Sequence, residues 1–136
     1  INNIQKEGNV DLHIHRSLGR FWYHGLLALS LQSDLRIACA GNSSSGIKET
    51  PAFGCPTVNI GPRQQSRLRG DNVIDAECNY REIVEKIEYS LFDDDFRKRS
   101  KNTNNPYYQG GASRKIVDIL SDISIEKKII LKKMTY

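Results

Sequence analysis

Short apolar segments alternate with segments of helical periodicity along most of this 136-residue sequence. The segments at residues 34–41, 56–61 and 73–75 have the composition of strands, and the first two end at a glycine. Strands that alternate with helices are typical of βα units, which build a parallel sheet with helices on its faces. The sequence therefore predicts an α/β fold, in which ligands bind beyond the carboxyl ends of the strands.

Helical periodicity recurs in four segments. Residues 21–32 are apolar and too numerous for a strand, so we expect a largely buried helix. Another helix is expected to start at Asn42 or at one of the serines after it, which are good N-cap residues, and to continue to Gly54. Two further helices are amphipathic, with apolar stripes at Ile83, Ile87 and Leu91 in residues 80–91, and at Ile116, Ile119 or Leu120, and Ile123 in residues 112–123.

The remaining segments are shorter or more polar. Residues 1–9 end in glycine and asparagine, as a helix commonly does, and the alternation in residues 10–14 predicts a short strand. Residues 93–111 are polar and rich in turn-forming residues. They predict a loop or a frayed helix, with a boundary near Pro106.

The composition is that of a globular domain, with 38% hydrophobic and 26% charged residues. We expect one partial domain over residues 1–123, followed by a basic tail over residues 124–136. The net charge of +4 is otherwise dispersed among acidic residues, so no nucleic-acid partner is expected. No apolar run approaches the roughly 20 residues of a membrane helix, and no secretory signal is recognisable. We therefore expect a cytoplasmic protein without a membrane partner.

Cysteine and histidine show no pattern of a metal or redox site. Cys39, Cys55 and Cys78 match no CxxC spacing, and we expect free thiols in a reducing compartment. His13 and His15 lie on one face of the short strand predicted at residues 10–14, but no third ligand is evident. We expect neither a metal nor a cofactor.

Three consecutive serines follow the first of the strands that end at glycine. Their hydroxyl groups suit phosphate oxygens, and the start of the expected helix adds a partial positive charge. Glycines on either side allow a sharp turn and a close approach of the backbone to a ligand. The same pattern is equally well explained by a cap that only starts the helix. The residues of this stretch are Gly41, Asn42, Ser43, Ser44, Ser45 and Gly46.

Charged side chains near the serines extend this pattern. Glu49 lies about one turn further on, where a carboxylate can accept hydrogen bonds from both hydroxyls of a ribose. A surface glutamate favoured near a helix N-terminus is the alternative. Arg63, Arg67 and Arg69 occupy the loop after the next strand, and their guanidinium groups fit phosphate. Arginines in a polar loop are also commonly just solvated. Both loops are expected at the same edge of the sheet.

Residues 41–75, GNSSSGIKETPAFGCPTVNIGPRQQSRLRGDNVID, resemble the signature of UDP-N-acetylglucosamine 2-epimerases, particularly the hydrolysing branch. The flanking residues 17–20 and 105–113 are similar to the same family, and the resemblance extends from about Val10 to Leu120. It implies a Rossmann-like parallel sheet, the later part of the second domain of a GT-B type fold. We therefore expect this chain to be a piece of a longer enzyme.

The resemblance also implies roles for individual residues. Ser43 and Ser44 would hold the UDP diphosphate, Glu49 the ribose, and Arg63 would lie near the nucleotide. Secondary candidates are Gly41, Asn42, Ser45, Gly46 and Arg67. The implied reaction eliminates UDP from UDP-N-acetylglucosamine and adds water, giving N-acetylmannosamine for sialic-acid-type amino sugars. The family's acid/base carboxylates belong to its first domain, so we assign no catalytic residue here and expect the isolated chain to be inactive.

Two other interpretations stay open. One is a GT-B type glycosyltransferase domain, and the other is a non-catalytic nucleotide-binding fragment. The serine run followed by an arginine-rich loop favours the epimerase. In each case the expected partner is UDP or a UDP-sugar, and exposed sheet edges favour a homo-oligomer.

Overall fold

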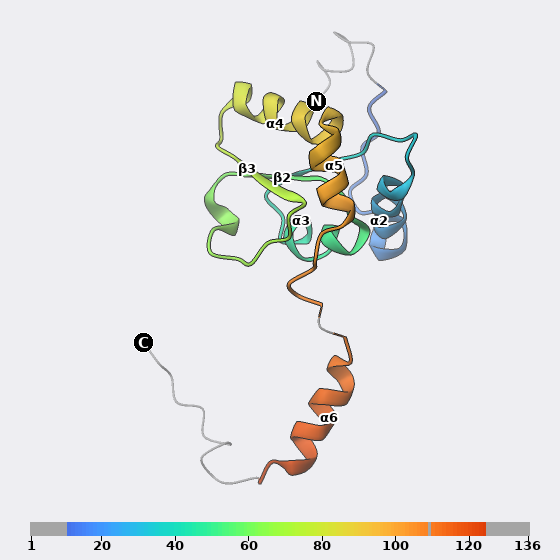
Figure 1. The fold of residues 1–136 in the computed structure, drawn as a ribbon, viewed down its shortest axis with the longest axis vertical. Coiled ribbons are helices and arrows are strands. Elements are labelled where there is room, and N and C mark those ends of the chain that lie inside the picture. The colour runs from blue at the N-terminus through green and yellow to red at the C-terminus, as the bar shows by residue number, and fades with distance from the viewer. Residues whose placement is uncertain (1–10, 109, 125–136) are drawn as a thin grey trace. The chain divides into compact units, whose positions relative to one another are not determined.

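The computed structural model describes residues 11–108 and 110–124 (Figure 1). The chain divides into two compact units, Ile1–Pro106 and Tyr107–Tyr136. The division coincides with the boundary that the sequence predicts near Pro106. The helix end predicted in residues 1–9, and all but the first residue of the predicted basic tail, lie outside the described residues.

A parallel sheet of three strands, in the order β1-β2-β3, forms the centre of the first unit. The strands are β1 (Cys39–Gly41), β2 (Thr57–Ile60) and β3 (Val73–Ala76). Thr57 at the start of β2 lies opposite Cys39 on one side and Val73 on the other, so the strands are in step. Their carboxyl ends therefore reach the same edge. The predicted α/β class, with a parallel sheet and flanking helices, is confirmed.

Helices lie on both faces of this sheet, with α4 (Tyr80–Phe92) above it and α3 (Ser45–Lys48) below it in the view of Figure 1. α4 packs on β2 and β3, whereas α3 packs on β1 and β2. α4 begins where the Asn79 side chain accepts hydrogen bonds from two backbone N–H groups of its first turn. The helices of the first unit are α2 (Gly19–Ala28), α3 (Ser45–Lys48), α4 (Tyr80–Phe92) and α5 (Asp94–Lys101), with 3₁₀ turns η1 (Leu29–Leu31), η2 (Thr50–Phe53) and η3 (Pro62–Gln64).

The core joins the sheet to the helices through both apolar and polar contacts. Val58 of β2, Ile47 of α3 and Phe96 of α5 are fully buried. Beside them, the buried Thr50 hydroxyl donates to the Gly46 carbonyl oxygen at 2.6 Å. The Asn72 side-chain amide donates to Thr50 Oγ1 at 3.1 Å and to the Cys55 carbonyl oxygen at 2.8 Å. These hydrogen bonds join η2 to α3 and to Asn72, the residue that precedes β3.

The strand predicted for residues 10–14 is wrong within the described residues. Residues 11–14 form no strand, and Val10 lies outside the described part. A strand needs a neighbour for its backbone hydrogen bonds, and no described strand pairs with this segment.

The helix predicted at residues 21–32 is present as α2 and η1, but it is not largely buried. Leu27 is buried, whereas the side chains of Phe21 and Trp22 are 80% and 68% exposed. The apolar residues surround the helix, but only one side of α2 packs against η2. Helical periodicity predicted the helix correctly and overestimated its burial.

The helix predicted to run from the serines to Gly54 is interrupted. α3 ends at Lys48, and η2 follows as a separate 3₁₀ turn that contains Pro51. Proline has no N–H group with which to continue the α-helical hydrogen bonds. Gly54 then ends η2 with φ 57°, and a Cβ at this position would lie 2.8 Å from the Lys101 Cα. Glycine therefore permits both the left-handed turn and the close approach of α5.

Residues 93–111 contain a regular helix, α5, instead of the predicted loop or frayed helix. The Asp93 side chain caps it by accepting a hydrogen bond from the Phe96 N–H at 2.7 Å. Phe96 is fully buried and stacks on Tyr89, with ring centroids 5.3 Å apart. One apolar residue in a polar segment gives no periodicity, so the sequence predicted a helix here only as one of two alternatives, and only as a frayed one.

The second unit contains α6 (Ala112–Asp122), which confirms the helix predicted there. Its apolar residues Ile116, Ile119 and Leu120 are exposed, contrary to the inward stripe that we expected. Within its own unit, the described residues provide no other element on which this stripe can pack.

Candidate functional site

Two loops meet at the carboxyl edge of the sheet, one after β1 and the other after β2. Gln64 in the second loop is only 3% exposed, and its side-chain amide donates to the Asn42 carbonyl oxygen at 2.9 Å. This hydrogen bond joins the two loops, which lie close together because β1 and β2 are parallel neighbours. The prediction that the serine loop and the arginine loop share one edge is therefore confirmed.

The three serines of the first loop have different surroundings. Ser45, at the start of α3, donates its hydroxyl to the Tyr23 hydroxyl oxygen at 2.6 Å. Ser43 Oγ accepts a long hydrogen bond of 3.3 Å from the Ser45 N–H. In the described part of the chain, the Ser44 hydroxyl has no hydrogen-bond partner, and its side chain is half-buried. The hydroxyl groups of Ser43 and Ser44 can therefore still donate a hydrogen bond to a ligand, whereas the Ser45 hydroxyl already donates to Tyr23 of α2.

The glycines on either side of the serines also differ. Gly41 has φ 150°, and open space surrounds the position of a Cβ. Gly46 is buried against β2, where a Cβ would lie 3.2 Å from Thr57 Cγ2. Gly41 therefore allows the chain to leave β1 in an unusual direction, and Gly46 lets α3 pack closely on the sheet.

Glu49 follows α3 and forms a contact that the sequence did not predict. Its Oε2 lies 2.6 Å from Nε2 of His24 in α2, and its side chain is 43% exposed. The His24 ring packs against Phe53, with centroids 5.1 Å apart. Glu49 is therefore held by a specific partner in α2.

The arginines of the second loop divide into two kinds. Arg69 forms an ion pair with Asp75 and donates a second hydrogen bond to the Gln64 carbonyl oxygen at 3.0 Å. Arg63 and Arg67 are exposed, and their side chains form no ion pair or hydrogen bond with other described residues. The structure thus leaves Arg63 and Arg67 available for an anionic ligand and uses Arg69 to shape the loop.

Asp75 links this loop to the sheet. The Asn59 side-chain amide donates to one of its carboxylate oxygens at 2.7 Å, and Arg69 binds the other. Partial burial alone would raise the pKa of Asp75. The hydrogen bonds from Arg69 and Asn59 have the larger effect, so the pKa lies below its usual value. The carboxylate therefore remains ionised and keeps Arg69 in place.

Gln64 and His24 are the residues that sequence reasoning missed at this edge. A glutamine in a polar loop and a histidine in an apolar helix carry no pattern that marks them as structural partners. The resemblance included the arginine–glutamine pair of residues 63 and 64, but it assigned a role only to Arg63.

The cysteines and histidines form no recognisable metal centre. No group of three or more His, Cys, Asp or Glu residues within residues 11–108 and 110–124 could hold a metal ion. Burial raises the pKa of the Cys55 thiol to about 11 and also raises the pKa of Cys39. Both thiols are therefore protonated near neutral pH.

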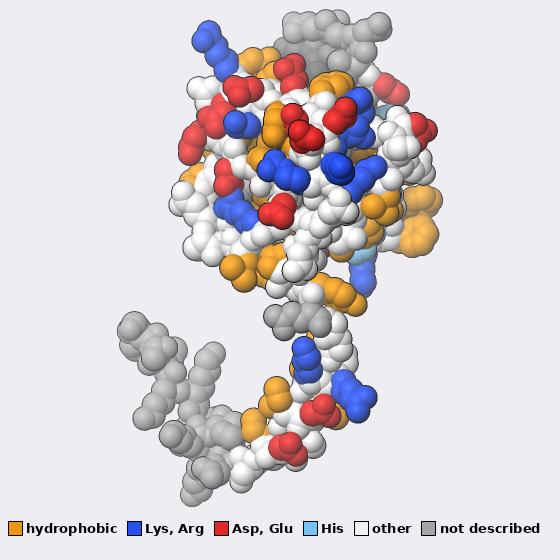
Figure 2. All heavy atoms as spheres, viewed as in Figure 1, with side chains coloured by type: hydrophobic (Ala, Val, Ile, Leu, Met, Phe, Trp, Pro, Cys, Tyr) orange, Lys and Arg blue, Asp and Glu red, His pale blue; other side chains and the backbone are white. Residues whose placement is uncertain are grey.

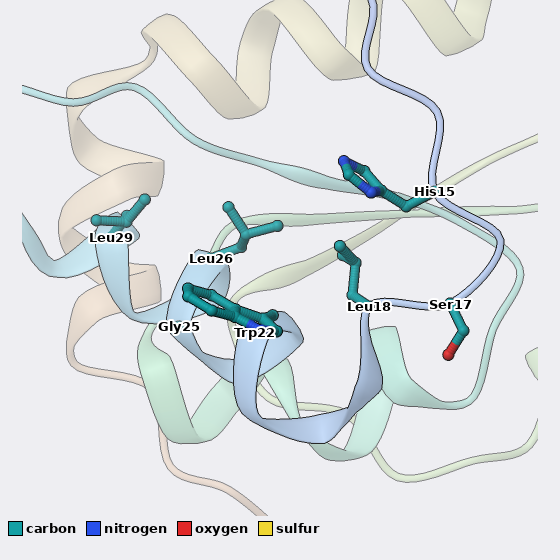
Figure 3. Close-up of a pocket in the computed structure, with 7 residues that line it drawn as sticks. All are labelled: His15, Ser17, Leu18, Trp22, Gly25, Leu26 and Leu29. Carbon is teal, nitrogen blue, oxygen red and sulfur yellow. The ribbon is translucent and has the colours of Figure 1, made fainter.

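An apolar groove runs along α2, lined by Trp22 and Leu26 from successive turns (Figure 3). Its volume is about 620 Å³, and it contains none of the residues predicted to bind UDP. The other residues that line it are His15, Ser17, Leu18, Gly25 and Leu29. Elsewhere, Figure 2 shows acidic and basic side chains interspersed over the visible face of the first unit, with no extended patch of one charge. None of the described helices is long and apolar enough to cross a membrane.

The parallel sheet with helices on both faces places this chain in the class of α/β domains. In such domains, ligands generally bind beyond the carboxyl ends of the strands. Comparison with known proteins identifies the particular family. The sequence matches the family described as UDP-N-acetylglucosamine 2-epimerase over residues 1–121, so the chain belongs to this family.

Curated relatives match shorter parts of the chain. Polysialic acid biosynthesis protein P7 of Escherichia coli is 40% identical over 82 residues, which are 60% of this chain and 21% of that protein. The UDP-N,N'-diacetylbacillosamine 2-epimerase (hydrolyzing) of Legionella pneumophila is 35% identical over 96 residues, 71% of this chain and 24% of that protein. The GDP/UDP-N,N'-diacetylbacillosamine 2-epimerase (hydrolyzing) of Campylobacter jejuni is 52% identical over 56 residues, 40% of this chain and 15% of that protein. The chain thus spans about a quarter or less of the length of these relatives.

Proposed function

We propose that this chain is part of a hydrolysing UDP-N-acetylglucosamine 2-epimerase and carries its site for the UDP diphosphate and ribose. The observation that supports this most directly is the hydrogen bond from Gln64 to Asn42, which brings the serine and arginine loops to one edge. Ser43 and Ser44 lie on one side of this bond, and Arg63 precedes Gln64 on the other.

The proposed roles follow from the chemistry of these side chains. Ser43 and Ser44 donate hydroxyl hydrogen bonds to the diphosphate, and Arg63, with Arg67 as a second cation, supplies positive charge. Glu49 accepts hydrogen bonds from the ribose hydroxyls through its partly exposed carboxylate. Gly41 and Asn42 shape the loop. Ser45 and Gly46 hold α3 in position through their contacts with α2 and β2.

In the proposed reaction, a base removes the proton from C2 of the sugar while the bond from C1 to the UDP oxygen breaks. UDP leaves with the bonding electron pair, and a glycal with a C1–C2 double bond remains. Water then adds across this double bond, with hydroxyl at C1 and a proton at C2, to give N-acetylmannosamine. The residues of this chain act on the leaving group, because donors near the diphosphate stabilise the negative charge that develops as the C1–O bond breaks.

Titration of the 136-residue chain with UDP by isothermal calorimetry tests the site. UDP is the nucleotide that the family name shares with the names of the Legionella and Campylobacter relatives. Each lost hydrogen bond to a charged group should weaken binding by about tenfold, so we expect at least this loss in Glu49→Gln and in the Ser43→Ala/Ser44→Ala double variant.

Ser33→Ala is the matched control, because Ser33 is exposed and lines a surface pocket with Asp94 and Lys98 of α5, which contains none of the candidate UDP residues. It should bind UDP like the unmodified chain. Circular dichroism establishes that each sample is folded. A folded chain that does not bind millimolar UDP, or that binds it equally well in all variants, would refute the proposed site.

A further inference from the structure

We propose that His24 is a positioning residue that orients Glu49 and thereby makes the site selective for ribose over 2′-deoxyribose. This inference rests on the proposed function, because it takes Glu49 to be the ribose ligand. The contact that carries it joins His24 Nε2 to Glu49 Oε2 at 2.6 Å, between residues 25 positions apart in the chain.

The position of His24 is fixed from several directions. Its ring packs against Phe53 of η2, and its side chain is only 28% exposed. The preceding residue of α2, Tyr23, receives the hydrogen bond from Ser45. Adjacent residues of α2 therefore hold both ends of the short helix α3, Tyr23 at its first residue and His24 at the residue after its last.

The consequence for Glu49 follows from the two oxygens of its carboxylate. Nε2 of His24 donates to Oε2, and Oε1 forms no hydrogen bond or ion pair with any residue in the described ranges. Oε1 and the remaining lone pair of Oε2 are thus left for the 2′- and 3′-hydroxyls of a ribose. Without His24, a side chain that is 43% exposed would have to be ordered by the ligand itself, at a cost in conformational entropy.

The test compares three ligands on the unmodified chain and on His24→Ala. UDP presents the whole diol, 2′-deoxy-UDP lacks one hydroxyl, and inorganic pyrophosphate lacks the ribose. We expect His24→Ala to weaken UDP binding by about tenfold and to reduce the preference for UDP over 2′-deoxy-UDP towards unity. Pyrophosphate affinity should change less than twofold, because the serines and arginines do not contact His24. General damage to the fold would instead weaken all three ligands together.

His24→Gln is the rescue variant, because its side-chain amide can still donate to Glu49. It should restore both the affinity for UDP and the preference for the ribose form. His13→Ala is the matched control, since His13 is exposed and contacts Asp11 away from the site. It should leave all three affinities unchanged.

The results separate the two proposals. If the unmodified, folded chain does not bind UDP, the proposed function fails. If it binds UDP but His24→Ala retains both the affinity and the ribose preference, only the positioning role of His24 is refuted. Failure of His24→Gln to restore the preference would also refute that role.

Discussion

The loops after β1 and β2 end at the same edge of the sheet but are held there in different ways. The first loop receives its hydrogen bond from Gln64 on a backbone carbonyl oxygen, that of Asn42. The second loop is held by its own side chains, Gln64 to the first loop and Arg69 to Asp75. The side chains of Ser44 and Arg63 form no hydrogen bond or ion pair with other described residues, whereas the adjacent side chains of Ser45 and Gln64 each donate one.

This difference shows that the residues of a single sequence signature have two different roles. Gln64 and Arg69 stabilise the loops, whereas Ser43, Ser44 and Arg63 are available to a ligand. The two kinds should separate experimentally: replacing a structural residue should lower the free energy of unfolding, and replacing a ligand residue should change only UDP binding.

The largest effect on stability is expected from Gln64→Ala. This change removes the hydrogen bond to Asn42 and leaves a cavity at a buried position, which should cost about 2 kcal/mol of unfolding free energy. The adjacent Gln65→Ala is the matched control, because Gln65 is exposed, and it should change stability by less than about 0.5 kcal/mol. Urea denaturation measures both. Equal stability of the two variants would mean that the loops are not joined through Gln64.

A smaller effect is expected from Arg69→Ala. Asp75 is 61% exposed, so solvent screening limits the loss in unfolding free energy to about 1 kcal/mol.

Arg63→Ala should show the opposite behaviour, with stability within about 0.5 kcal/mol of the unmodified chain and UDP binding about tenfold weaker. Denaturation and calorimetry on the same samples measure the two properties. If Arg63→Ala destabilised the chain as much as Arg69→Ala does, the division of the arginines would be wrong.

The smallest effect is expected from acid. The pKa of Asp75 is lower in the folded chain than its ordinary value, so the unfolded chain binds more protons as the pH falls below about 4. The stabilisation by Asp75 is therefore present above that pH and is lost as the pH falls through the folded pKa. It should amount to less than about 1 kcal/mol, because the carboxylate is largely exposed.

Unfolding measured between pH 5 and pH 2 tests this prediction. Asp75→Asn should be less stable than the unmodified chain at pH 5, and the difference should disappear towards pH 2. Asp71→Asn is the matched control, because Asp71 is an exposed aspartate just before β3 and forms no ion pair among the described residues. A difference for Asp75→Asn that grew as the pH fell would contradict the prediction.

Much of the fold was predictable from local pattern. The three strands follow from short apolar runs, and α4 and α6 follow from helical periodicity. Gly41 is the last residue of β1, and Gly61 directly follows β2. α5 was not predictable in this way, because its buried residue Phe96 is isolated among polar ones. The burial of α2 was overestimated because periodicity reports the apolar residues of a helix and carries no information on its neighbours.

For the candidate site, the sequence by itself determined the chemical types and their order: serines after one strand, a glutamate after them and arginines after the next strand. That order, with parallel strands in step, places both loops at one edge. The tertiary structure decided which of these side chains are engaged, with Ser45 held by Tyr23, Glu49 by His24 and Arg69 by Asp75. The first two of these contacts join residues more than twenty positions apart, and local propensity carries no information about partners that only the packing of α2 against α3 and η2 brings together.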